Sequence, residues 1–220
     1  MRMLLEHPRS DAEDPGARIH VRNKLGLTAL HLAAEWGRAE ACRMLLERGT
    51  LVDDTDENGN TPLHLSAQSG DLDIMRVLLE HPRADAEDPG TRIHARNKRG
   101  QTALHRAAQS GKADACRLLL ERGALVDVID KNGNTPSHFA AGIRGWPPSP
   151  TTIRFLLEYR AKEGLGGLPR AHKLRNRLRR RGEDTDSGHG GEPWLAILED
   201  FASQIEPVEV SLADTWFVDV

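Results

Sequence analysis

The 220-residue sequence is poor in several features that define common protein classes. Aromatic residues make up only 4% of it and hydrophobic residues 38%, both low for the core of a globular enzyme. No run of 18 apolar residues occurs, so no transmembrane span is predicted, and the start is too short and polar for a secretory signal. Cys42 and Cys116 have no CxxC or Cys/His spacing, which argues against a metal site and favours buried thiols in a reducing compartment.

An excess of charge of one sign is also missing from most of the chain. Residues 1–169 hold 23 basic and 23 acidic residues, which argues against nonspecific nucleic-acid binding by this part. Residues 170–181 then carry seven positive charges and no acid, whereas residues 182–220 carry ten acids and no Lys or Arg. The basic run is either a nuclear-import or anionic-partner patch, or a solvated linker that can fold onto the acidic tail.

What the chain does contain is one seven-residue motif in four copies. It reads TALHLAA at 28–34, TPLHLSA at 61–67, TALHRAA at 102–108 and TPSHFAA at 135–141, at spacings of 33, 41 and 33 residues. Such a period predicts a stacked repeat architecture. Each Thr is expected to cap a helix by accepting a bond from the backbone N–H of the His three residues later. The predicted structural capping residues are Thr28, His31, Thr61, His64, Thr102, His105, Thr135 and His138.

A second helix is expected after each motif, as in CRMLLERG at 42–49, IMRVLLEH at 74–81 and CRLLLERG at 116–123. Turn segments DENGNT at 56–61 and DKNGNT at 130–135 precede two of the motifs. With these features the chain resembles the ankyrin repeat family over roughly residues 1–163. The resemblance implies an all-α solenoid of helix-turn-helix units with projecting β-hairpin fingers. A partly ordered C-terminal tail would follow it.

The repeats form a larger duplication, because residues 3–64 and 77–138 are identical at 45 of 62 aligned positions. Within each copy one finger is eight residues longer than the other, and its segments RIHVRN and RIHARN are expected to be short extended arms. The expected organisation is a partial repeat with a long finger at 1–22, then four repeats over 23–163 (about 23–55, 56–96, 97–129 and 130–163). A Gly/Arg-rich linker at 164–192 and an acidic-aromatic segment at 193–220 follow.

The last segment has two interpretations. Its apolar stripe, Trp194, Leu198, Phe201 and Ile205, has helical spacing, so the segment is expected to pack on the fourth repeat as a cap. The alternative is a tail that binds a partner.

Catalysis is not expected, because the sequence has no GxSxG, HExxH or P-loop and its motif histidines are explained by capping. No cofactor, metal or small-molecule substrate is expected either. His20 and His94 lie on the fingers, and Arg106 replaces the Leu or Phe of the other motifs, with its guanidinium expected to reach solvent.

The resemblance implies a non-catalytic protein–protein interaction module in the cytoplasm, with the nucleus as the alternative location. A nuclear regulatory protein that uses residues 170–181 and the acidic tail, or the repeat fragment of a larger signalling protein or enzyme, is the alternative function. Trp36 is either a binding hot spot on the concave surface or packed under the neighbouring long finger. By the same resemblance, the partner-binding positions are Lys24, Leu25, Leu27, Glu35, Trp36, Glu57, Asn58, Asn60, Gln68, Ser69, Lys98, Arg99, Gln101, Gln109, Ser110, Lys131, Asn132 and Asn134.

Overall fold

The computed structural model describes residues 17–82, 92–142 and 149–163. The chain divides into two units, Met1–Leu157 and Glu158–Val220, and of the second unit only residues 158–163 are described. The predictions for the start of the partial repeat, the linker at 164–192, the basic run at 170–181 and the C-terminal segment at 193–220 lie outside the described residues.

The described part is helical and contains no strand. After the 3-10 turn η1 (Ala17–His20), two kinds of helix alternate along the chain. The inner helices carry the repeated motif and are α2 (Ala29–Glu35), α4 (Pro62–Ser69), α6 (Ala103–Gln109) and α8 (Pro136–Ala140). The helices that follow them are α3 (Ala39–Glu47), α5 (Leu72–Glu80), α7 (Ala113–Glu121) and α9 (Pro150–Lys162).

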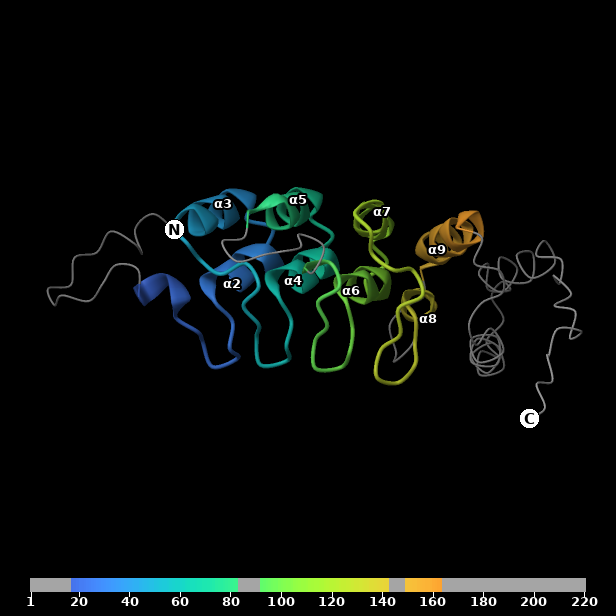
Figure 1. Cartoon of the computed structure of the whole chain (residues 1–220), viewed down its shortest axis with the longest axis horizontal. Helices are drawn as coiled ribbons and strands as arrows, with labels where there is room; N and C mark the ends of the chain where they lie inside the picture. The colour runs from blue at the N-terminus through green and yellow to red at the C-terminus, as the bar shows by residue number, and fades with distance from the viewer. Residues whose placement is uncertain (1–16, 83–91, 143–148, 164–220) are drawn as a thin grey trace, which may run out of the picture. The chain divides into compact units, whose positions relative to one another are not determined.

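Two parallel rows of helices result from this alternation. The inner helices pack in the order α2, α4, α6, α8, and the outer helices in the order α3, α5, α7 (Figure 1). Leu30, Leu63 and Leu104 of the inner helices are at most 2% exposed, and the small side chains at Ala34 and Ala67 are fully buried. Small residues at these positions let neighbouring helices approach closely. The all-α solenoid predicted from the repeat is confirmed.

Finger loops extend from the inner helices, on the side away from the outer row (Figure 1). Their tips are Asn23–Leu27, Asp56–Asn60, Asn97–Gln101 and Asp130–Asn134. Each tip is closed by a backbone bond from the N–H of its first residue to the carbonyl of its last, 2.9–3.0 Å long. Neighbouring tips are also joined, because Glu57 N–H donates to the Leu25 carbonyl (3.1 Å), and Lys98 and Lys131 repeat this bond to the tip before them (2.9 and 3.0 Å).

The fourth residue of each tip must be glycine for two reasons. Gly59 and Gly100 both have φ of +76°, a left-handed conformation that other residues rarely adopt. In addition, a Cβ on Gly59 would lie 2.9 Å from the backbone nitrogen of Lys98, and one on Gly100 would lie 2.9 Å from that of Lys131. The glycine therefore allows the next finger to stack against it.

The arms of the long fingers are not extended at their start, where extended chain was predicted. Residues 17–20 form a 3-10 turn, and residues 92–94 lie in an equivalent turn in the second copy. The physical reason is burial: Ile19 and Ile93 are 7% and 3% exposed, so the turn places an isoleucine side chain in the core.

Candidate functional site

The repeated Thr and His residues build the start of each inner helix. Thr28 N–H donates to His31 Nδ1 (3.2 Å), and its hydroxyl lies 2.8 Å from the same nitrogen. The equivalent distances are 3.1–3.2 Å and 2.8–3.0 Å in the other three motifs. All four form the reciprocal capping box, although the hydroxyl's bond from the His31 N–H is long, at 3.5 Å. The imidazole therefore supplies much of the cap that we predicted for the Thr hydroxyl.

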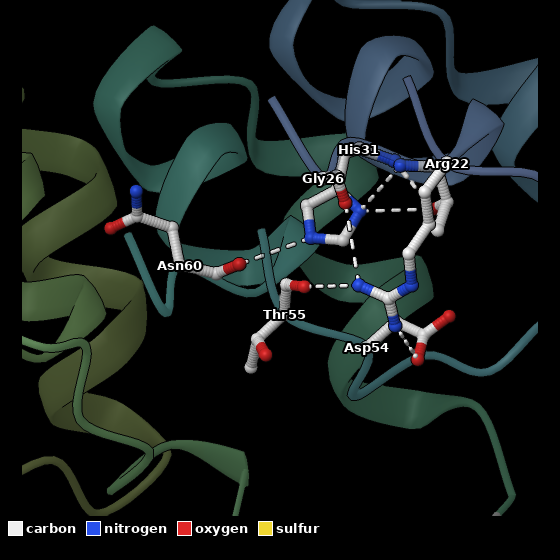
Figure 2. Close-up of polar contacts among 7 residues, drawn as sticks. Arg22, Gly26, His31, Asp54, Thr55 and Asn60 are labelled. Carbon is white, nitrogen blue, oxygen red and sulfur yellow. Dashed lines mark hydrogen bonds and ion pairs between the residues drawn. The ribbon is translucent and has the colours of Figure 1, made fainter. Parts of the chain in front are cut away.

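Three of these histidines also join their repeat to the next one. Nε2 lies 3.0 Å from the Asn60 carbonyl at His31, 3.0 Å from the Gln101 carbonyl at His64 and 3.1 Å from the Asn134 carbonyl at His105 (the first in Figure 2). A carbonyl only accepts hydrogen bonds, so Nε2 carries the proton and Nδ1 is the acceptor for the Thr. This arrangement requires a neutral ring.

Burial lowers the pKa of all three rings, against the opposing effect of the carbonyl at Nε2. The pKa of His64 and of His105 falls to about 4, and that of His31 is also lowered. A proton added at Nδ1 would point at the Thr N–H, so the geometry and the pKa direction agree.

Three predicted partner-binding residues belong to this buried network. Asn60, Gln101 and Asn134 are 6%, 1% and 6% exposed, and their carbonyls receive the histidine bonds. The Asn60 amide donates to Asp56 (2.9 Å) and its oxygen accepts from Asn97 (2.9 Å). In this structure these side chains hold the fingers together and are out of a partner's reach.

Asp130 shows how the buried carboxylate at the first position of a finger tip obtains its hydrogen bonds. Its carboxylate accepts bonds from the N–H groups of Asn132 and Asn134, both 2.8 Å long. Burial alone would raise the pKa of this carboxyl, but the hydrogen bonds from Asn134 and Asn132 lower it below its ordinary value. The group is therefore a carboxylate at neutral pH.

Two exposed arginine side chains connect neighbouring fingers. Arg22 bonds to the carbonyl of Thr55 and to the carboxylate of Asp54 (2.7 Å) in the next finger (Figure 2). Its counterpart Arg96 reaches the carbonyl of Ile129 (2.7 Å). His20 and His94, beside these arginines, are exposed.

The other predicted partner-binding residues are accessible, and we group them under the name inner face. It consists of the exposed finger-tip residues together with the accessible residues of α2, α4 and α6 and the residues that follow α2 and α6. Leu27, Gln68, Gln109 and Ser110 are half-buried, and the others are exposed. The predicted members are Lys24, Leu25, Leu27, Glu35, Trp36, Glu57, Asn58, Gln68, Ser69, Lys98, Arg99, Gln109, Ser110, Lys131 and Asn132.

One end of the inner face is apolar. Trp36, the residue that ends α2, is 69% exposed and Leu25 at the first finger tip is 61% exposed. Leu32, which the sequence analysis missed, is 36% exposed and lies four residues before Trp36, on the same side of the helix. The long fingers of the alternative interpretation lie mostly outside the described residues, so both interpretations of Trp36 stay predictions.

The middle of the inner face carries Arg106, a second residue that the sequence analysis did not place there. Its guanidinium bonds to the side-chain oxygens of Gln68 and Gln109 (3.2 Å for the latter). Its Nε is buried and has no hydrogen-bond partner. Burial, with a smaller contribution from the neighbouring Arg99, lowers the pKa of Arg106. The guanidinium, which was expected to reach solvent, is half-buried, because it bonds to a glutamine of α4 and a glutamine of α6.

The described residues show no cluster suited to a metal ion. Within 17–82, 92–142 and 149–163, no group of three His, Cys, Asp or Glu side chains could hold a metal. Cys42 and Cys116 are buried free thiols, as predicted, and burial raises the pKa of both, to about 11 for Cys42. The helices of this part are all too short or too polar to cross a bilayer.

Stacked helix pairs with projecting fingers define a repeat protein of the solenoid class. A family model described as ankyrin repeats (3 copies) matches residues 2–89 and 86–164, which is well over half of the chain. The chain belongs to the ankyrin repeat family. No curated protein matches it significantly. Ankyrin repeats generally serve as non-catalytic protein–protein interaction modules.

Proposed function

We propose that this protein is a non-catalytic interaction module that binds a protein partner through its inner face. The observation that carries the proposal is the exposed apolar patch of Leu25, Leu32 and Trp36 at one end of that face. Clustered apolar side chains in water are unfavourable, and a large exposed aromatic is the commonest kind of interface hot spot.

The rigidity of the finger stack supports the same proposal. Backbone bonds between tips and the histidine bonds between repeats hold the fingers in register before any partner arrives. A preformed surface loses little conformational entropy on binding, so more of the contact energy becomes affinity.

A comparison of three proteins tests the proposal. The wild type, the inner-face variant Trp36→Ala, Arg99→Glu and the control variant Leu51→Ala, Arg48→Glu would be used to capture partners from a cell lysate, with recovery measured by quantitative mass spectrometry. Leu51 and Arg48 are exposed but lie at the end of α3 and just beyond it, off the inner face.

We expect proteins that the wild type and the control retain to fall about tenfold or more with the inner-face variant, the loss typical of a removed hot spot. Equal recovery of every captured protein by all three would contradict binding through the inner face.

A further inference from the structure

The two tandem copies within this chain allow positions that differ to be compared on one scaffold. Seventeen of the 62 aligned positions in 3–64 and 77–138 differ, and the differences are not alike in kind. Those in the outer helices α3 and α7 and just before them are conservative. They pair Arg38 with Lys112, Glu40 with Asp114 and Met44 with Leu118.

The inner face, by contrast, changes its chemistry between the copies. Five positions that are accessible in both copies exchange apolar or acidic residues for cationic or neutral polar ones, and a sixth, Leu27, is matched by the buried Gln101. These five positions together carry two negative charges in the first copy and three positive charges in the second. The pairs are Leu25 with Arg99, Leu32 with Arg106, Glu35 with Gln109, Trp36 with Ser110, and Glu57 with Lys131.

The inner-face cations of the second copy form no ion pair in the described part of the chain. The ion pairs found there involve other arginines, such as Arg22 with Asp54, and none includes Lys98, Arg99, Arg106 or Lys131. Arg106 bonds only to neutral glutamine oxygens and keeps a buried Nε without a partner. In the second copy Val128 stands at the position of Asp54. Arg96 therefore lacks the acidic partner that the equivalent Arg22 has in the first copy.

A group of cations without ion-pair partners is unfavourable by itself, because like charges repel one another. Arg99 lies close enough to lower the pKa of Arg106, and the Arg106 guanidinium is partly removed from water. The carboxylate of Asp56 opposes this effect on the pKa of Arg106, but it is buried and already accepts the N–H bonds of its own finger tip. An anionic group from outside would relieve the repulsion and could accept a bond from Arg106.

We infer that the inner face is divided, and that its second half binds a segment of the partner rich in Asp or Glu, while its first half takes an apolar side chain of the same partner. This inference rests on the proposed function and adds the chemical class of the ligand. The acidic segment would lie over Lys98, Arg99, Arg106 and Lys131, and the apolar residue against Leu25, Leu32 and Trp36.

A nucleic acid is the other anionic polymer that cations attract, but the inner face favours a peptide. Its first half carries Glu35 and Glu57, both exposed, which would repel a phosphate backbone that continued across the fingers. The adjoining aliphatic residues Leu25 and Leu32 suit an apolar side chain.

A peptide selection tests the inference without knowledge of the partner. A random dodecapeptide library displayed on phage would be selected on the wild-type protein, and the affinity of enriched peptides would be measured by fluorescence anisotropy. The same measurement would use the exchange variant Arg99→Leu, Arg106→Leu, Lys131→Glu, in which each new residue is the one at the equivalent first-copy position. The control variant Lys112→Arg, Asp114→Glu, Leu118→Met makes the same kind of exchange in and beside α7.

We expect enriched peptides to combine Asp or Glu with an apolar residue. Their affinity should fall about tenfold or more in the exchange variant, the sum expected for several exposed charge contacts, and stay within about twofold in the control. Raising the salt concentration should weaken binding to the wild type and have less effect on the exchange variant. The neutral variant Arg99→Gln, Lys131→Gln makes the same comparison if the exchange variant does not fold.

The contradicting outcomes separate the two proposals. Enriched peptides that need Trp36 but carry no acidic residues would overturn this inference and leave the proposed function intact. Tighter binding of a 12-nucleotide oligouridine than of any enriched peptide would also overturn it. The absence of any peptide whose binding depends on the inner face would overturn the proposed function and this inference together.

Discussion

The two copies, residues 3–64 and 77–138, share the capping and finger-tip residues that join the repeats and differ at five accessible positions of the inner face. The capping Thr28, His31 and their equivalents Thr102, His105 are the same, as are the tip glycines Gly26 and Gly100. The Thr and His residues are buried, and each glycine lies against the backbone of the next finger. The tip residues Leu25 and Arg99 have exposed side chains that take no part in these contacts. One is apolar and the other is cationic.

We propose from this contrast that fold and recognition reside at separate positions of one unit. Each shared capping histidine bonds to a backbone carbonyl of the next repeat, which a residue of any type there can supply. A differing residue of the inner face would act through its own side chain. Changes at shared positions should therefore destabilise either copy, and changes at differing positions should alter binding with little effect on stability.

The largest effect is expected from alanine at a finger-tip glycine. In Gly100→Ala the left-handed φ costs about 1–2 kcal/mol, and overpacking against the backbone nitrogen of Lys131 adds roughly 1–3 kcal/mol. Gly123→Ala is the matched control, because Gly123 has φ of +94° but nothing within 4 Å of a Cβ. Urea unfolding should show a loss two to three times larger for Gly100→Ala, and equal losses would show that finger stacking does not constrain the glycine.

The next largest effect is a loss of stability on mild acidification. The pKa of His64 and of His105 is about 4 in the folded protein against 6.5 ordinarily, so at pH 5.5 the unfolded chain binds protons that the folded one does not. The stabilising contribution of these two neutral rings is fully present above pH 6.5 and is lost progressively as the pH falls toward 4. Between pH 7.5 and 5.5 the free energy of unfolding should drop by about 2–3 kcal/mol from these two rings.

Two variants check the origin of this pH dependence in urea unfolding. His105→Gln should flatten it by about half, whereas His94→Gln, at an exposed finger position, should leave it unchanged. If His94→Gln reduces the pH dependence of stability as much as His105→Gln does, the buried motif histidines are not its source.

A smaller effect is expected when the cap loses its hydroxyl. Thr61→Val and Thr135→Val remove the contact to His Nδ1 at 2.9 and 2.8 Å but keep the Thr backbone N–H that donates to the same nitrogen. Each should lower the free energy of unfolding by about 0.5–2 kcal/mol. Unchanged urea midpoints in both variants would mean that the imidazole alone forms the cap.

The sequence predicts the repeated parts of the fold well, because capping Thr, turn Gly and apolar Leu signals act within a few residues of each other. It does not predict which finger residues are buried. Asn58 and Asn60 are two residues apart, yet only Asn60 is buried, because its side chain bonds both to Asp56 and to Asn97 of the next finger.

Contacts between repeats are the other part that the sequence leaves open. Arg106 and Gln68 are 38 positions apart, and no local pattern indicates that an arginine in a leucine position will bridge two glutamines. The exposure of Leu32 depends likewise on which neighbours cover α2 and not on its own motif, since the equivalent Leu65 is 7% exposed.

The separation of fold from recognition is tested most directly by one stability measurement on an inner-face exchange. A variant with Arg99→Leu, Arg106→Leu, Gln109→Glu and Lys131→Glu places first-copy residues on the second copy and would be compared with wild type by urea unfolding at pH 7.5. If differing positions serve recognition alone, the free energy of unfolding should stay within about 1 kcal/mol of wild type, the range of ordinary surface changes. A loss as large as that of Gly100→Ala would contradict the account, because it would mean that these side chains hold the repeats together.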